Sequence, residues 1–420
     1  MEDFVTAVKV FCQDQNWKGL GDYINESVPL ITKNASKIDS AISALDAKDH
    51  TLGYLGLIVI KLSLPNIGDF ELFFNQVAQL IEGGCQTQIQ SQGVDKFTHI
   101  CHCLVKILVE QRKAFRGIYL IDQAIQKIQE SPSQLTSLHP DFLQLCLVAK
   151  CMKPAIKYLN IDIASIQESA KDAKIFLLYY YYGGMVYLAL KQYEKALFFF
   201  QVAVTTPCMV ISQIMLEAYK KFLLLSIFIH GKIVALPKYT SSVVSRYLKP
   251  LSNAYWELAD AYSKHDADGV TAIANKHQQT FQNDNNVGIV KQVISSLTKK
   301  RIQKLTKTFL TLSLVDMASR VKLRNADEAE KYLLEMIEDG SIYATIDQQA
   351  GMVSFQNNPD RFNSNNVLEK IHSEMEKCIR MNEQLITMDN DMQQNQQYVH
   401  KMMSMTHLDD TNRVEEIMMD

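Results

Sequence analysis

The scarcity of turn-forming residues constrains the fold of this chain more than any other feature of its sequence. The chain has 420 residues but only 16 Gly and 9 Pro. An all-β protein of this length needs many turns built from these two residues, whereas a protein of long helices needs few. Hydrophobic residues make up 47% of the chain, enough to form a core, and the length favours two or three units or one long helical stack.

One stretch of the chain, YYYYGGMVYLALKQYEKALFFFQVAVTTP, fits a repeat of two antiparallel helices. Small residues at Gly184 and Ala196 would let the two helices approach closely, while aromatic side chains fill the space between successive pairs. A small residue recurs near the start of the second helix at intervals of 38, 41 and 39 residues, at Gly117, Ala155, Ala196 and Ala235. This period is typical of a solenoid of tetratricopeptide-like helix pairs.

The sequence pattern changes in the last third of the chain. A capping box at Ser313 and Asp316 opens one helix. A second box at Asn325 and Glu328 opens the next helix, which Gly340 would end. The β-branched run IYATI and the segment MVSF then predict two strands joined by a turn. Helices followed by a two-stranded hairpin predict a winged helix.

A C-terminal helix is expected over about 363–395, with an apolar stripe spaced by three and four residues. The stripe consists of Ile371, Met375, Cys378, Leu385 and Met388, with Asn382 interrupting it. Such spacing is typical of a coiled coil or a helical bundle, and a stripe at a chain end needs a partner. The remaining residues, 396–420, are Met-rich and acidic, and we expect them to form a flexible tail.

The sequence offers no residues for catalysis, for a cofactor or for a metal ion. A zinc metalloprotease needs H-x-H or H-E-x-x-H, and neither occurs, nor do the phosphate-binding and serine-nucleophile motifs. The segment THICHCLVK contains His99, Cys101, His102 and Cys103, but neighbours on a helix point about 100° apart and cannot converge on one ion. The eight Cys are scattered and suit core packing in a reducing compartment. We therefore expect a protein that is not an enzyme.

The charge distribution disfavours DNA and membranes as partners. The formal net charge is −3, and the strongest apolar stretch, Tyr54–Leu64, is interrupted by Lys61 and too short to span a bilayer. The N-terminus lacks the pattern of a secretory signal. One basic cluster consists of Lys299, Lys300, Arg301, Lys304 and Lys307. A solvated face or an acidic protein partner fits this cluster better than nucleic acid, and an RNA-binding winged-helix adaptor is the alternative from another class.

A helical stack followed by a winged helix is the arrangement of the PCI module, which the proteasome lid, the COP-nine signalosome and eukaryotic initiation factor three share. Long segments of the chain also resemble the third-subunit family of the signalosome, in the same order and over residues 1 to about 390. These segments are HTLGYLGLIVIKLSLPN, QLTSLHPDFLQLCLVAKCMKPAIKYL, YYYYGGMVYLALKQYEKAL, FLTLSLVDMASRVKL and MIEDGSIYATIDQQAGMVSF.

This resemblance implies both a fold and a division into domains. We expect an all-α protein with a right-handed, tetratricopeptide-like helical solenoid, a winged-helix PCI module and a C-terminal helix. The expected regions are N-terminal repeats at 1–190, a PCI domain at 191–362, a bundle helix at 363–395 and a tail at 396–420. Within the PCI domain, 191–286 would be helical and 287–362 would be the winged helix.

The resemblance also implies a function. The chain would be a non-catalytic scaffold that supports deneddylation of cullin-RING ubiquitin ligases through contacts between PCI modules and in a helical bundle. Its partners would be the other signalosome subunits, including PCI subunits and the metalloprotease pair, with cullin-RING ligases as indirect partners, in the cytoplasm and the nucleus. A PCI subunit of the proteasome lid or of a translation initiation factor is the alternative within this class.

Two interfaces follow from these expectations. The unpaired edge of a small sheet is a template for a strand from a neighbour. We expect this hairpin interface at Ile342, Tyr343, Ala344, Thr345, Ile346, Val353 and Phe355. We expect the tail-helix interface at Ile371, Met375, Cys378, Asn382, Leu385 and Met388.

Overall fold

The computed structural model describes residues 2–400, apart from 35–36, 65–68, 161–162, 164, 168–171, 265–266, 322 and 357–364. The chain divides into two units, Met1–Lys300 and Arg301–Asp420. Helices dominate both units, as the sequence predicted. None of the described helices is long and apolar enough to cross a membrane.

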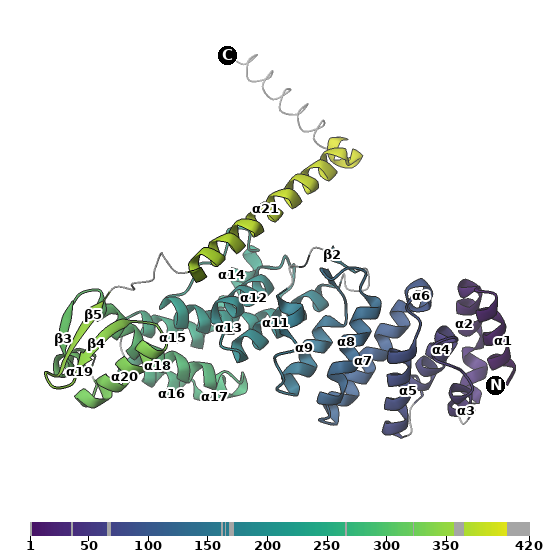
Figure 1. The fold of residues 1–420 in the computed structure, drawn as a ribbon, viewed down its shortest axis with the longest axis horizontal. Helices are drawn as coiled ribbons and strands as arrows, with labels where there is room; N and C mark the ends of the chain where they lie inside the picture. Colours follow the sequence, from purple (N-terminus) through teal and green to yellow (C-terminus); the bar gives the residue numbers. More distant parts are fainter. Residues whose placement is uncertain are drawn as a thin grey trace, which may run out of the picture. The chain divides into compact units, whose positions relative to one another are not determined.

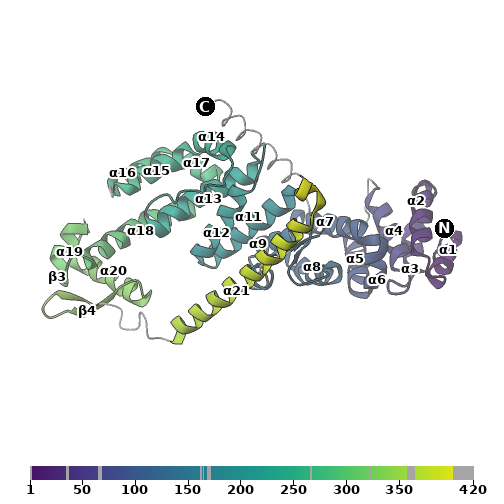
Figure 2. The same ribbon diagram turned by 90° about the horizontal axis from the view of Figure 1, so that it is seen from above.

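The first unit is a succession of helices in which sequence neighbours pack on one another (Figures 1 and 2). Its first part contains α1 (Glu2–Gln13), α2 (Trp17–Lys33), α3 (Ile38–Ser43), α4 (Thr51–Leu62), α5 (Phe70–Gly83), α6 (Gln86–Gln88), the π-helix η2 (Ile89–Gly93), α7 (Val94–Glu110) and α8 (Phe115–Ile128). Its second part contains β1 (Gln134–Leu135), α9 (His139–Val148), α10 (Ile156–Leu159), β2 (Ser165–Ile166), α11 (Ala173–Ala189), α12 (Tyr193–Thr205), α13 (Gln213–His230), α14 (Ser242–Leu251), α15 (Asn253–Ser263), α16 (Ala267–Lys276) and α17 (Gln278–Asn283). The strands β1 and β2 form a short parallel pair.

The second unit contains three strands and begins within a helix that the two units share. Its elements are the end of α18 (Val287–Thr306), β3 (Thr311–Ser313), α19 (Leu314–Val321), α20 (Ala326–Glu338), β4 (Tyr343–Asp347), β5 (Met352–Gln356) and α21 (Asn365–Gln394). Its core joins Ile302 of α18, Met317 of α19, Leu333 of α20 and Val353 of β5, all without solvent exposure.

The predicted starts of α19 and α20 and the predicted end of α20 are confirmed. The hydroxyl of Ser313 accepts a hydrogen bond from the N–H of Asp316 at 3.0 Å, as expected of a helix cap. Asn325 makes no such bond, and Glu328 instead accepts from the N–H of Arg324 at 3.1 Å. Gly340 has a φ of +67° and ends α20 in the left-handed conformation that glycine adopts without strain.

The tyrosine run of α11 packs inside the first unit. Tyr179 and Tyr187 are buried, and their hydroxyls donate hydrogen bonds of 3.0 Å to the carbonyls of Tyr158 and Leu159 at the end of α10. The last carbonyls of a buried helix need such donors because no further turn supplies them. The tyrosines therefore fill space and complete the hydrogen bonding of α10.

Close packing between α11 and α12 depends on small residues, as the sequence predicted. A Cβ atom on Gly184 would lie 2.8 Å from Cε1 of Phe200, closer than real Cβ atoms come to a neighbour. Ala196 of α12 is fully buried. A side chain larger than hydrogen at Gly184 would thus push the two helices apart.

The repeat predicted from small residues is correct at Gly117, Ala155 and Ala196, which lie in or just before the helices α8, α10 and α12. It is wrong at Ala235, which is exposed in the loop between α13 and α14. Gly231 ends α13 with a φ of +74°, and α14 begins only at Ser242. The prediction at Ala235 used only the spacing of small residues and did not consider where the sequence ends α13 and begins α14.

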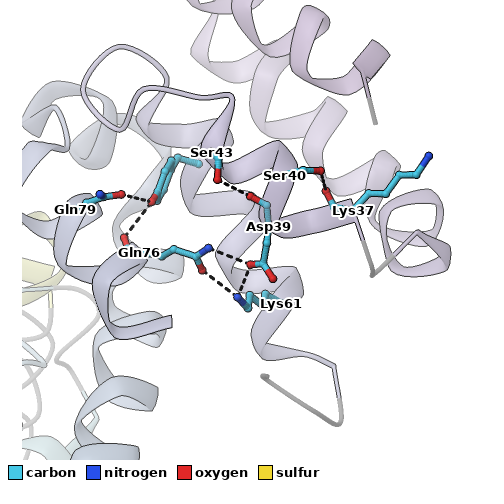
Figure 3. A network of polar contacts seen from close by, with 8 residues as sticks. Lys37, Asp39, Ser40, Ser43, Lys61, Gln76 and Gln79 are labelled. Carbon is cyan, nitrogen blue, oxygen red and sulfur yellow. Dashed lines mark hydrogen bonds and ion pairs between the residues drawn. The ribbon is translucent and has the colours of Figure 1, made fainter. Parts of the chain in front are cut away.

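A charged side chain is buried in the first unit and is paired with polar neighbours (Figure 3). Lys61 of α4 has a side chain that is only 6% exposed, and its Nζ lies 2.5 Å from Oδ1 of Asp39 and 3.0 Å from Oε1 of Gln76. The amide of Gln76 donates to the same Asp39 oxygen at 3.0 Å. This network joins α3, α4 and α5 and explains how Lys61 can interrupt the apolar stretch of α4.

His139 begins α9 as a buried, neutral ring. Its Nδ1 accepts a hydrogen bond of 3.0 Å from the N–H of Thr136, which a doubly protonated ring could not do, and it lies 2.8 Å from the hydroxyl of the same residue. Burial lowers the pKa of His139 to about 4.

We expect Ala196→Leu to lower the free energy of unfolding by about 1–3 kcal/mol, because the added methylene groups overpack the space between α11 and α12. Urea unfolding followed by circular dichroism measures this change. The control is Ala272→Leu on the exposed face of α16, which should shift stability by less than about 0.5 kcal/mol. Equal midpoints for Ala196→Leu and wild type would show that this site is not tightly packed.

We also expect acid to destabilise the fold through His139. The unfolded ring binds a proton below about pH 6.5, whereas the folded ring resists it until about pH 4. The stability that the neutral ring contributes is therefore present above pH 6.5 and is lost as pH falls towards 4. In urea titrations, His139→Gln should become more stable relative to wild type over this range. Parallel pH profiles for the two proteins would contradict this role.

Candidate assembly surfaces

The sheet of the second unit has three strands in the order β3-β5-β4, whereas the sequence predicted a two-stranded hairpin. The additional strand β3 pairs antiparallel with β5, and β4 pairs with the other side of β5. At three residues, Thr311–Ser313 is too short to show an alternating pattern, and the adjacent helix cap dominates its sequence.

The structure gathers the predicted hairpin residues in this sheet and divides them between its faces. Val353 and Phe355 lie on the central strand and are 0% and 8% exposed. Ile342 is buried just before β4, and Ala344 and Ile346 pack against the core from β4. Tyr343 and Thr345 are exposed on the other face of β4. Most of these side chains therefore build the core of their own unit, so a partner would meet β4 through its backbone.

Hydrogen bonds on the β3 side show which way the backbone of β5 points. The N–H of Phe355 donates to the carbonyl of Leu310, next to β3, at 2.8 Å. Backbone groups of successive residues in a strand point to opposite sides. The N–H and C=O of Ser354 therefore face β4.

The free edge of β4 follows from this alternation. Thr345 lies opposite Ser354 and pairs with it inside the sheet. The N–H and C=O groups of Ala344 and Ile346 consequently point to the outer edge. No described strand pairs with that edge, so it can accept a strand from another chain.

The C-terminal helix α21 exposes its apolar residues to solvent. The predicted helix is confirmed over Asn365–Gln394, and every side chain from Leu368 to Gln394 is exposed. The predicted residues Ile371, Met375, Leu385 and Met388 are 56–63% exposed, and Cys378 and Asn382 are exposed on the same helix. A soluble chain rarely leaves such a contiguous apolar strip uncovered.

The apolar face of α21 is broader than the sequence predicted. Placing Met375 at heptad position a also places the polar residues Asn382 and Asp389 at a. The flanking e and g positions in the middle of the helix are apolar and 54–61% exposed, at Ile379, Met381, Ile386 and Met388. Only Met388 among these four residues was predicted, although the sequence places the other three beside the predicted apolar stripe. Such a wide face fits a bundle with more than one neighbouring helix.

The basic cluster near the winged helix is partly used inside the protein. Lys300 donates to the carbonyl of Ile229 at the end of α13 at 2.5 Å, and Arg301 donates to the carbonyl of Val321 at the end of α19 at 3.0 Å. Cations are favourable at helix C-termini. Two of the five side chains of the cluster are therefore engaged inside the protein.

The segment THICHCLVK, whose His and Cys residues are of the types that bind metals, lies on α7. Cys101 is fully buried, and His102 contacts Asp141 of α9. Cys103 Sγ lies 3.8 Å from Nε2 of His99. Among the described residues, no three His, Cys, Asp or Glu side chains are arranged to hold a metal ion.

Comparisons with known proteins match both parts of the chain. The family model described as "COP9 signalosome complex subunit 3, N-terminal helical repeats" matches residues 14–244, and the PCI domain model matches residues 274–357. A Drosophila melanogaster protein named COP9 signalosome complex subunit 3 is 38% identical and covers 96% of this chain and 94% of its own length. An Arabidopsis thaliana protein of the same name is 35% identical and covers 86% and 84%.

In the isolated chain we expect the amide hydrogens of 365–394 to exchange far faster than those of the buried helix α9. The reason is that every side chain of α21 from Leu368 on is exposed, and helices in proteins take most of their stability from tertiary packing. Hydrogen exchange with mass spectrometry tests this, with peptides from α9 as the protected reference. Strong protection of 365–394 in the monomer would show that α21 packs on its own chain.

Proposed function

This chain belongs to the family of COP9 signalosome subunit 3, and from that premise we propose that it is a non-catalytic scaffold supporting deneddylation of cullin-RING ubiquitin ligases. The exposed apolar face of α21 is the observation that supports this most strongly. A scaffold gains its stability from covering such surfaces in a complex, whereas an enzyme needs a cleft with converging reactive groups.

The edge of β4 is the first proposed contact. Two PCI modules would continue one sheet across their interface by pairing Ala344 and Ile346 with a strand of the neighbouring subunit. The predicted interface residues then act in two ways. The backbone of β4 forms the hydrogen bonds, while Val353 and Phe355 hold the sheet against its own core.

The second proposed contact is a bundle formed by α21 with helices of other subunits. Asn382 would fix the register of this bundle at some cost in stability, as a polar residue at position a does in coiled coils. Ordering α21 on binding would cost free energy, so this contact should be weaker than its buried area suggests.

The proposed partners are the other signalosome subunits, both the PCI subunits and the metalloprotease pair, with cullin-RING ligases reached indirectly. The chain would work in the cytoplasm and the nucleus. For domain boundaries, we keep the proposal of repeats at 1–190, a PCI domain at 191–362, a bundle helix at 363–395 and a tail at 396–420. Residues 401–420 of that tail lie outside the described residues.

We expect Ala344→Pro to abolish co-purification of PCI partners while the isolated chain stays folded. Proline at this position removes an N–H from the outer edge and leaves the hydrogen bonds between β4 and β5 in place. Thr345→Pro is the matched variant that breaks the inner ladder, and it should lower the melting temperature of the second unit. Affinity purification and thermal melting measure the two effects. A full complement of subunits with Ala344→Pro would exclude this edge as the contact.

We further expect the purified chain to contain substoichiometric zinc and to leave a modified cullin uncleaved. The reason is that neither H-x-H nor H-E-x-x-H, the motifs that supply two His ligands in zinc metalloproteases, occurs in the sequence. Elemental analysis and a cleavage assay check this, with the intact signalosome as the positive control. One zinc per chain, or cleavage by the chain alone, would overturn the scaffold assignment.

A further inference from the structure

Four large apolar side chains gather beside one groove of the first unit, well away in sequence from β4 and α21. Met209 and Val210, in the loop between α12 and α13, are 95% and 81% exposed. Tyr247 and Leu251 of α14 are 51% and 61% exposed. Together with Ile211, Leu216 and Val243 they line a groove of about 420 Å³.

Local sequence keeps this groove open. Helix α12 ends at Thr205, and Pro207 cannot supply the N–H that would continue it. Helix α13 begins at Gln213, and the hydroxyl of its N-cap, Ser212, accepts from the N–H of Met215 at 3.3 Å. The residues between these two signals therefore cannot join either helix, and Met209 and Val210 are held in the loop with their side chains exposed.

Helix α14 contributes one of its two apolar faces to the groove. Val244 and Leu248 are buried against the rest of the unit, at 1% and 0% exposure. Val243, Tyr247 and Leu251 lie four residues apart on a different face, which lines the groove. This row runs about 12 Å along α14, the length of two helical turns.

The stretch from Ala218 to Trp256, which contains α14, carries charges of one sign, and Glu217, which accepts from the lining residue Gln213 at 3.4 Å, is itself paired with Lys220. No Asp or Glu occurs between Glu217 and Glu257, while Lys232, Lys238, Arg246 and Lys249 are exposed in that stretch. The guanidinium of Arg246 lies 5.5 Å from the centre of the Tyr247 ring, at the border of the groove. A ligand that covers the apolar side chains and carries carboxylates would be attracted to this surface.

We propose that this groove binds a short acidic, amphipathic helix of a partner protein. Side chains rather than free strand edges line the groove, so a peptide bound there must satisfy its own backbone hydrogen bonds, and a helix does so. Apolar residues three and four positions apart on this helix meet Val243, Tyr247 and Leu251, and its carboxylates meet Arg246. Met209 and Val210 supply contacts that adapt to the shape of the bound side chains.

Photocross-linking in the complex purified from cells tests this proposal. Benzoylphenylalanine replaces Tyr247 or Met209 in the full-length chain, and the control replaces the exposed Tyr119 of α8. Mass spectrometry of the cross-linked peptides should find, at both groove positions, a segment of another protein with helical apolar spacing and net negative charge. A basic segment, a segment of this same chain, RNA, lipid, or no cross-link above the Tyr119 control would overturn the proposal.

Fluorescence anisotropy of a peptide with the cross-linked sequence, bound to the full-length chain, then measures how much charge contributes to binding. Arg246→Glu should weaken its binding about 10-fold, and replacing the facing Glu of the peptide by Lys should restore the loss. Leu251→Asp should abolish binding, and thermal melting shows whether each variant is folded. Unchanged affinity in both folded variants would place the peptide outside the groove and reject the proposal.

Discussion

The first unit depends on one constraint: its most apolar helices cannot be stable alone and must be covered on both sides. Helix α4 is buried along almost its whole length, and α13 is nearly as enclosed. A helix that is hydrophobic on all faces is stable only in the interior of a protein. Each pair therefore provides the surface that buries the next pair, and closely packed positions such as Gly184 fix how near they come. Stability is consequently shared along the stack rather than held in one central core.

Burying helices so completely also buries some of their charged side chains. Lys61 is held by Asp39, and Lys220 lies 2.8 Å from both Glu217 and Asp284. Such pairs add little net stability, because removing the charges from water costs about as much as their attraction returns. Removing one partner alone would leave an uncompensated charge inside the stack. These networks therefore favour one arrangement of helices over slipped alternatives.

Features coded by neighbouring residues were predictable from the sequence, and features that depend on distant pairing were not. The caps around Ser313 and Gly340 and the length of α21 are local, and the structure confirms them. The strand β3 exists only because β5 lies beside it, so three residues could not reveal it. The orientation of the Ala344 backbone depends in turn on that pairing. For the interfaces, the sequence could identify the apolar stripe of α21, but the division of the hairpin into core side chains and edge backbone required the register of the whole sheet.

Methionine makes up much of the exposed face of α21, and this has a consequence for newly made copies of the chain. Met375, Met381, Met388 and Met392 are each at least half exposed. Oxidation converts a thioether into a polar sulfoxide, and solvent access makes this reaction easier. Until a neighbour covers them, these sulfurs are open to peroxide, and each sulfoxide would make the face less able to join an apolar bundle. A copy of the chain that spends longer without partners would thus carry more methionine sulfoxide on the face of α21 that later joins the bundle.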